Sequence, residues 1–241
     1  MGELRQLAGI LIAGALISIV GLLIGLAIPG FTEGDLVVTE YHASYTYEGS
    51  LEESYQYEVR AADTYRSLNR IFDAPVSFQN PATAPVTLLS ATVPPGTQAY
   101  LKDSTGMVHM EGGTVEQTAL IQERASLNEA GALSNTFYAP GTWDIRYSWM
   151  ITPPIERGTD GDHLNIDLAT SHIPYHGITI TIPARGVREI YAHPAGLEIT
   201  KGGDTYILTG DAPADVPLGF ELVLETGMGD QIQGRIEDLG G

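Results

Sequence analysis

The most pronounced hydrophobic pattern in the chain is an uncharged apolar run near its start. Residues 7–28 read LAGILIAGALISIVGLLIGLAI, and Pro29 and Gly30 follow them. About 22 helical residues at ~1.5 Å each span roughly 33 Å, which matches the hydrocarbon core of a bilayer. A cleaved secretory signal is the alternative, but such signals have a basic leader and an apolar core of only about 7–15 residues. The pattern therefore predicts a retained transmembrane helix over residues 7–29.

The charges that flank this run predict its orientation. Arg5 precedes the run, whereas the first basic residue after it is Arg60. Because cytoplasmic flanks carry the excess of Lys and Arg, we expect residues 1–6 to be a cytoplasmic leader. Residues 30–35 would then be a linker to an extracytoplasmic domain, and the protein would be a single-pass protein of the cell membrane.

Small residues recur on one face of the predicted helix. Gly14, Ser18, Gly21 and Gly25 follow one another at spacings of four, three and four. Small side chains on one stripe let helix backbones approach closely in lipid, although glycine is also common in membrane helices generally. The stripe predicts a helix-packing surface.

Beyond residue 36 the hydrophobic period changes to two. From residue 41 to residue 47 every second residue is Tyr or Ala, and Leu51, Glu53, Tyr55, Tyr57 and Val59 alternate with polar residues after a Gly49 turn. This alternation predicts a β-hairpin with a tyrosine-rich buried face. A platform for stacking sugars is the alternative interpretation of the tyrosines.

Further apolar segments separated by Gly and Pro predict more strands. They cover residues 86–93, 98–102, 143–151, 178–182, 205–209 and 220–225. Only residues 115–129, which are rich in Ala, Leu, Gln and Glu, have a helical pattern. Many short strands with such breakers predict a mainly β fold, an antiparallel β-sandwich. Residues 36–155 would form one β-rich module, and residues 156–241 a second portion of the same or an adjoining module.

Composition narrows the function classes. The chain has 30 acidic and 12 basic residues, a formal net charge of −18 and no cysteine. Such a charge disfavours nucleic acid as a partner, and a chain without cysteine has no thiol chemistry or disulfides. The expected partners are the membrane and other envelope proteins, or a second copy of the chain.

Polar residues between 156 and 176 form the densest candidate site for a metal. Asp160, Asp162, His163 and Asp167 carry oxygen and nitrogen ligands, and the oxygens would suit Ca²⁺. Their spacing is not that of a twelve-residue calcium loop, and Pro174 separates His172 from His176 and disfavours a helical zinc pair. We therefore expect a solvated acidic loop followed by a strand, with no metal or other cofactor.

Two arginines after the hairpin form the second candidate group. Arg66 and Arg70 lie close together in a chain that is poor in bases. An Arg–carboxylate bridge between strands is one interpretation, and a contact with an anion or a partner is the other. No sequence pattern of a nucleophile or of a phosphate-binding loop supports an enzyme.

Several phrases of the sequence together resemble a known family. They are residues 41–59, TYRSLNRIFDAP (64–75), GTW (141–143), PPIE (153–156), HLN (163–165), HIPY (172–175), His193-Pro194 and FELVL (220–224). In this order they are similar to the extracytoplasmic domain of the twenty-two-oh-seven domain-of-unknown-function family of predicted membrane proteins, in its archaeal type. The resemblance implies a β-rich exported domain beside membrane helices, with no established activity.

These observations lead to one preferred function and two alternatives. The preferred function is that of a non-enzymatic, membrane-anchored cell-envelope protein whose acidic β domain contacts other proteins. The first alternative is a structural subunit of a helix-cored complex or filament. The second is a membrane-anchored metal-dependent hydrolase, in which His163 and Asp167 would have to meet in a cleft.

Overall fold

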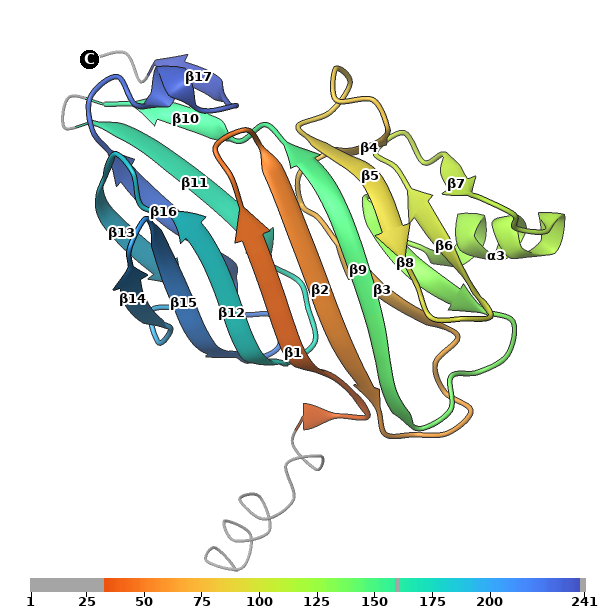
Figure 1. Ribbon diagram of the computed structural model, residues 1–241. Coiled ribbons are helices and arrows are strands. Elements are labelled where there is room, and N and C mark those ends of the chain that lie inside the picture. The colour runs from red at the N-terminus through yellow and green to blue at the C-terminus, as the bar shows by residue number, and fades with distance from the viewer. Residues whose placement is uncertain (1–32, 159–160, 239–241) are drawn as a thin grey trace, which may run out of the picture. The chain divides into compact units, whose positions relative to one another are not determined.

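The structure, a computed structural model, describes residues 33–158 and 161–238 (Figure 1). The predicted transmembrane helix over residues 7–29, its glycine stripe and Asp160 lie outside the described residues. Within the described ranges, no helix has the length and apolar character needed to cross a bilayer. From Leu36 onward the chain forms one compact unit.

Three β-sheets make up this unit, and they confirm the predicted mainly β architecture. The first sheet has eight strands in the order β14 (Glu198–Gly202), β15 (Thr205–Ala212), β12 (Tyr175–Pro183), β1 (Leu36–Tyr45), β2 (Ser50–Val59), β9 (Gly141–Ile151), β5 (Val86–Thr92) and β4 (Val76–Phe78). The second has the order β13 (Val187–His193), β16 (Leu218–Leu224), β11 (Asp162–Ala169), β10 (Pro154–Arg157) and β17 (Arg235–Asp238). The third has the order β3 (Ser67–Ile71), β8 (Glu129–Ser134), β6 (Thr97–Lys102) and β7 (Val108–Met110).

The eight-stranded sheet packs one face against both smaller sheets, which lie behind it in Figure 1. One continuous apolar cluster joins Tyr55 of β2 with Leu68 of β3 and Leu164 of β11. The rings of Tyr45 and Phe220 lie 6.0 Å apart across the layers, and those of Phe72 and Trp149 lie 4.8 Å apart. The alternating apolar residues of each strand therefore meet in one core between two layers.

The predicted tyrosine hairpin is present as β1 and β2. The two strands pair antiparallel, with Tyr41 opposite Tyr55 and Tyr45 opposite Leu51. Tyr41, Tyr45, Tyr55 and Tyr57 are each at most 2% exposed. Rings this deeply buried are part of the core, so they do not form a sugar-stacking surface.

Strands from both halves of the chain share the eight-stranded sheet. β12 pairs in parallel with β1, with Ile178 opposite Tyr41, so the prediction of an antiparallel sandwich is wrong for this sheet, which is mixed. Ile178, Ile180 and Ile182 are buried and extend the inner face of β1. Residues before and after position 156 thus contribute to the same sheet and the same core.

The helix and the acidic segment differ from the sequence prediction. The helix α3 (Val115–Arg124) begins at a Thr114 cap that forms a capping box with Gln117, and it ends at Arg124 because Ala125 is extended. The expected last helical residue, at position 129, instead begins β8. Similarly, the segment predicted as an acidic loop forms β10 and β11, because alternate residues of β11 such as Leu164 and Ile166 are buried in the core.

A close backbone approach in the five-stranded sheet generates a test of this packing. A Cβ at Gly219 of β16 would lie 2.3 Å from the carbonyl oxygen of Ile166 on β11. We expect Gly219→Ala to lower the free energy of unfolding by about 1–3 kcal/mol, since the strands would have to separate. Urea denaturation followed by tryptophan fluorescence measures this change.

The matched control is Gly202→Ala, because a Cβ at Gly202 would meet no atom within 4 Å. Its stability should be unchanged or slightly higher, as the substitution restricts the unfolded chain. Equal stability of the two variants would show that β11 and β16 do not approach as described.

Candidate functional site

A glutamate lies in the middle of the apolar core. Glu53 occupies the inward-facing phase of β2, between Leu51 and Tyr55, and its side chain is 0% exposed. Its Oε1 accepts hydrogen bonds from the hydroxyls of Tyr41 (2.6 Å) and Tyr55 (2.9 Å). Its Oε2 accepts one from Nε1 of Trp149 on β9 (2.8 Å). The carboxylate is therefore bonded at both oxygens within the eight-stranded sheet.

The counter-charge of Glu53 comes from the four-stranded sheet. Arg70 of β3 places Nη2 3.2 Å from Oε1 of Glu53, and its side chain is 1% exposed. Its Nε donates to the Tyr55 hydroxyl (2.9 Å), and its Nη2 also donates to the carbonyl of Leu168 on β11. One guanidinium thus connects all three sheets.

Aromatic rings enclose this guanidinium. The Cζ of Arg70 lies 3.2 Å from the centroid of the Phe72 ring and 5.5 Å from that of the Trp149 ring. Such cation–π contacts partly replace the lost hydration of the charge. Nη1 of Arg70 has no hydrogen-bond partner among the described residues.

The ionisation of this centre follows from its surroundings. Burial by itself lowers the pKa of Arg70, but the Glu53 carboxylate and the nearby tyrosines raise this pKa above its ordinary value. Burial raises the pKa of Tyr41 and of Tyr55 well above 10. The arginine therefore stays charged and the tyrosines stay neutral hydrogen-bond donors, which makes this centre a structural ion pair.

The structure separates the two arginines that the sequence groups together. Arg70 forms the Arg–carboxylate bridge that was one of the two interpretations. The other interpretation, a surface contact with an anion or a partner, does not fit Arg70 because its guanidinium is buried. Arg66 donates through Nη2 to the backbone carbonyl of Asn135 at 3.0 Å. No sequence signal except the in-phase position of Glu53 indicated the partner of Arg70.

The metal candidates do not converge. Asp162 is buried and accepts hydrogen bonds from Nε of Arg157 (3.2 Å) and from the backbone N–H of Gly229 (3.0 Å). Nδ1 of His163 lies 2.9 Å from Oε1 of Glu221. Asp162 and His163 are successive residues of β11 and point to opposite faces, whereas His163 and Asp167 share a face but lie roughly 13 Å apart along the strand. His163 and Asp167 therefore do not meet in one cleft.

The two histidines after β11, His172 and His176, also lie close to groups other than the metal candidates. The two ring nitrogens of His172 lie 2.5 Å and 2.7 Å from the carbonyl oxygens of Ile173 and Val216. Nδ1 of His176 lies 3.6 Å from Oδ1 of Asp211. In the part of the chain that the structure describes, no three His, Asp or Glu side chains gather where they could hold a metal ion.

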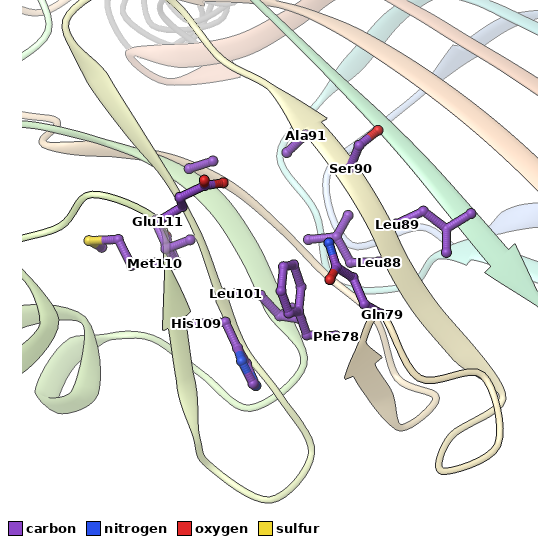
Figure 2. A pocket seen from close by; sticks show the side chains of 12 residues that line it. Phe78, Gln79, Leu88, Leu89, Ser90, Ala91, Leu101, His109, Met110 and Glu111 are labelled. Atoms are coloured by element: carbon purple, nitrogen blue, oxygen red, sulfur yellow. The ribbon is translucent and has the colours of Figure 1, made fainter.

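A groove of about 580 Å³ opens at one end of the two layers. Figure 2 shows its lining, with Phe78 of β4 between β5 and the strand that carries His109. The rings of Phe78 and His109 are stacked with centroids 5.0 Å apart, and Nε2 of His109 lies 2.8 Å from Oδ2 of Asp103. The groove is lined by Phe78, Gln79, Leu88, Leu89, Ser90, Ala91, Ala99, Tyr100, Leu101, His109, Met110 and Glu111.

The edges of two sheets border this groove because their last strands are short. β4 pairs with β5 only as far as Phe78 and Leu88, and β7 pairs with β6 only from Tyr100 onward. Leu89–Thr92 of β5 and Thr97–Ala99 of β6 therefore have no strand beside them on the groove side among the described residues. Neither β4 nor β7 was predicted from the sequence, although the closely spaced Pro75, Pro81 and Pro85 are typical of a very short edge strand.

Three packed sheets, an internal ion pair and a groove at the sheet edges define a mainly β unit. The chain belongs to the family described as Predicted membrane protein (DUF2207) N-terminal domain, which matches residues 37–224. The resemblance found in the sequence is thereby confirmed. A comparison with the curated proteins found no match.

Solved structures show only a distant likeness. Aminopeptidase A from Legionella pneumophila is 9% identical with a TM-score of 0.40, and the match covers 78% of this chain and 21% of that one. An M1 zinc metallopeptidase from Deinococcus radiodurans is 14% identical with a TM-score of 0.41 over 78% and 42% of the two chains. Leukotriene A4 hydrolase from Saccharomyces cerevisiae is 8% identical with a TM-score of 0.42 over 78% and 29%. The chain thus spans less than half the length of these structures.

The buried ion pair generates a prediction about stability. Glu53→Gln would leave the Arg70 guanidinium buried without a counter-charge, so we expect it to lower the free energy of unfolding by about 3–5 kcal/mol. The double variant Glu53→Gln/Arg70→Met should be less destabilised than the sum of the single variants. Asp230→Asn is the control, because it breaks the exposed pair with Arg157 and should cost at most about 1 kcal/mol. Additive losses at Glu53 and Arg70 would contradict the coupling.

The buried tyrosines generate a prediction about alkaline pH. Burial raises the pKa of Tyr47 and of Tyr138 to about 12, whereas unfolded tyrosines ionise near 10. From about pH 10 upward the unfolded chain therefore releases protons that the folded chain retains, and the free energy of unfolding falls as the pH rises. Tyrosinate absorbance should appear together with the loss of circular dichroism. Tyrosinate absorbance of most tyrosines in a still-folded protein would refute this.

Proposed function

We propose that this chain is a non-enzymatic, membrane-anchored cell-envelope protein that displays its acidic β unit outside the membrane and binds another protein there. The observation that carries this proposal is the groove at the edges of the two sheets. Its walls combine exposed apolar side chains with strand backbone that pairs with no described strand on the groove side. Phe78 and Leu89 are each 37% exposed there, and such apolar surface at a concave site suits a protein contact.

The interior supports a binding role rather than catalysis. Glu53 and Arg70, the most deeply buried ionisable pair, bond to each other and to core residues instead of facing a cavity. The net charge of −18 disfavours nucleic acid and anionic lipid surfaces as ligands. A protein partner with basic residues is the class that this charge favours.

A site-specific photo-crosslinker tests the proposal in the full chain in its native membrane. A crosslinking residue in place of Phe78 should give a discrete adduct with another envelope protein, identified by mass spectrometry. The matched control replaces Ile199, which is 38% exposed on β14 at the other edge of the same sheet. Absence of an adduct from position 78, or the same adduct from both positions, would refute binding at the groove.

A further inference from the structure

The open edge of β5 is the feature that identifies what the groove accepts. We call residues 89–92 the β5 edge. Their other side pairs with β9, from Ser90 opposite Ser148 to Thr92 opposite Arg146. On the groove side, none of the described strands continues beyond the pairing of Phe78 with Leu88. Alternate backbone N–H and C=O groups of the β5 edge therefore point toward the groove without a strand to pair with.

The chain itself ends β4 at this point. Gln79 has φ of +51°, a left-handed conformation that is uncommon for a residue with a side chain. Its N–H still donates to the carbonyl of Leu88 at 3.0 Å, and the chain then turns away from β5. The position that a longer β4 would occupy beside the β5 edge therefore holds no described strand.

The two edges of the eight-stranded sheet differ in how they are protected. β14, at the opposite edge, carries Glu198 and Lys201, and charges on an edge strand discourage pairing with another chain. The β5 edge reads Leu89-Ser90-Ala91-Thr92 and carries neither a charge nor a proline. An edge of this composition is suited to pairing with an added strand.

We propose that the groove binds an extended segment of a partner protein, which adds to the sheet beside the β5 edge along the line that β4 vacates. This inference rests on the proposed function and names the form of its ligand. Backbone hydrogen bonds to the β5 edge supply the affinity, and alternate side chains of the segment supply the specificity. One set of alternate side chains faces the apolar floor that Leu88 and Leu101 form, so this set is apolar.

Charge selects the other set of side chains. Glu111 lies in the groove, and the whole chain carries a net charge of −18. A segment that alternates apolar and basic residues is therefore favoured over an acidic one. A second copy of this chain is disfavoured as the partner, because two chains with this charge repel each other.

The experiment uses the full chain in detergent with synthetic hexapeptides as probes. Three peptides alternate valine with lysine, serine or glutamate, and a fourth is the lysine peptide with alternate backbone amides N-methylated. Hydrogen exchange should show that the lysine peptide protects amides of the β5 edge, with the glutamate peptide weakest. N-methylation should weaken binding roughly tenfold or more, because it removes backbone donors and keeps the side chains.

Two matched variants locate the binding. Leu89→Lys should weaken binding of the lysine peptide roughly tenfold, because it places a like charge at the groove. Ile199→Lys, at a position of equal exposure on the other edge, should leave binding unchanged. Circular dichroism establishes that both variants fold. The N-methylated peptide tests strand addition on the unmodified chain, where no variant has to fold.

Four results would overturn the addition of a partner segment as a strand. They are equal binding of the N-methylated peptide, protection of Glu198–Gly202 instead of the β5 edge, no protection by any peptide at about 1 mM, and protection without peptide that rises with protein concentration, which would mean pairing between copies. If any of the first three occurs while the crosslink from position 78 persists, the groove still binds a protein but not as an added strand. Loss of that crosslink would instead remove the proposed function.

Discussion

The ion pair between Arg70 and Glu53 is the interaction on which the arrangement of the three sheets depends. Each buried charge costs several kcal/mol unless it is paired and hydrogen-bonded. The partners of this pair lie on β1, β2, β9, β3 and β11, so they belong to all three sheets. Any packing that removes one sheet leaves a buried charge or a buried donor unsatisfied. The apolar core supplies the bulk of the stability, and the ion pair requires that the three sheets meet around Arg70.

Two sheet edges, the one at Leu168 of β11 and the β5 edge, differ in what lies beside them. Where the two smaller sheets meet, Arg70 of β3 donates to the carbonyl of Leu168, which lies beyond the pairing of β10 with β11. This contact occupies part of an edge that would otherwise remain unsatisfied in the interior. At the other end, β4 and β7 are only three residues long, and the β5 edge borders the groove instead of a neighbouring strand. A side chain contacts the interior edge, whereas no described strand pairs with the peripheral edge beyond Leu88.

This division assigns stability and function to different regions. The ionisable residues of the interior are bonded to one another, and the metal candidates on β11 either point to opposite faces, as Asp162 and His163 do, or lie roughly 13 Å apart along the strand, as His163 and Asp167 do. The groove, by contrast, has exposed apolar residues and unpaired backbone in a chain of high negative charge. The proposed partner segment would accordingly be recognised at the groove, by its backbone and its basic residues, and not in the interior.

The sequence by itself determined the elements whose residues alternate locally. The period of two between residues 41 and 59 and between residues 143 and 151 predicted β1, β2 and β9, because one face of each strand is buried. It also placed Glu53 in the buried phase. It did not identify β10 and β11 within the acidic segment, or the early end of α3, because there the burial of Leu164 and the pairing of Glu129 with Ile71 of β3 override local composition. The partner of Arg70 and the groove were decided only by tertiary structure, since both depend on which distant strands lie side by side, and long-range pairing leaves no periodic trace in the chain.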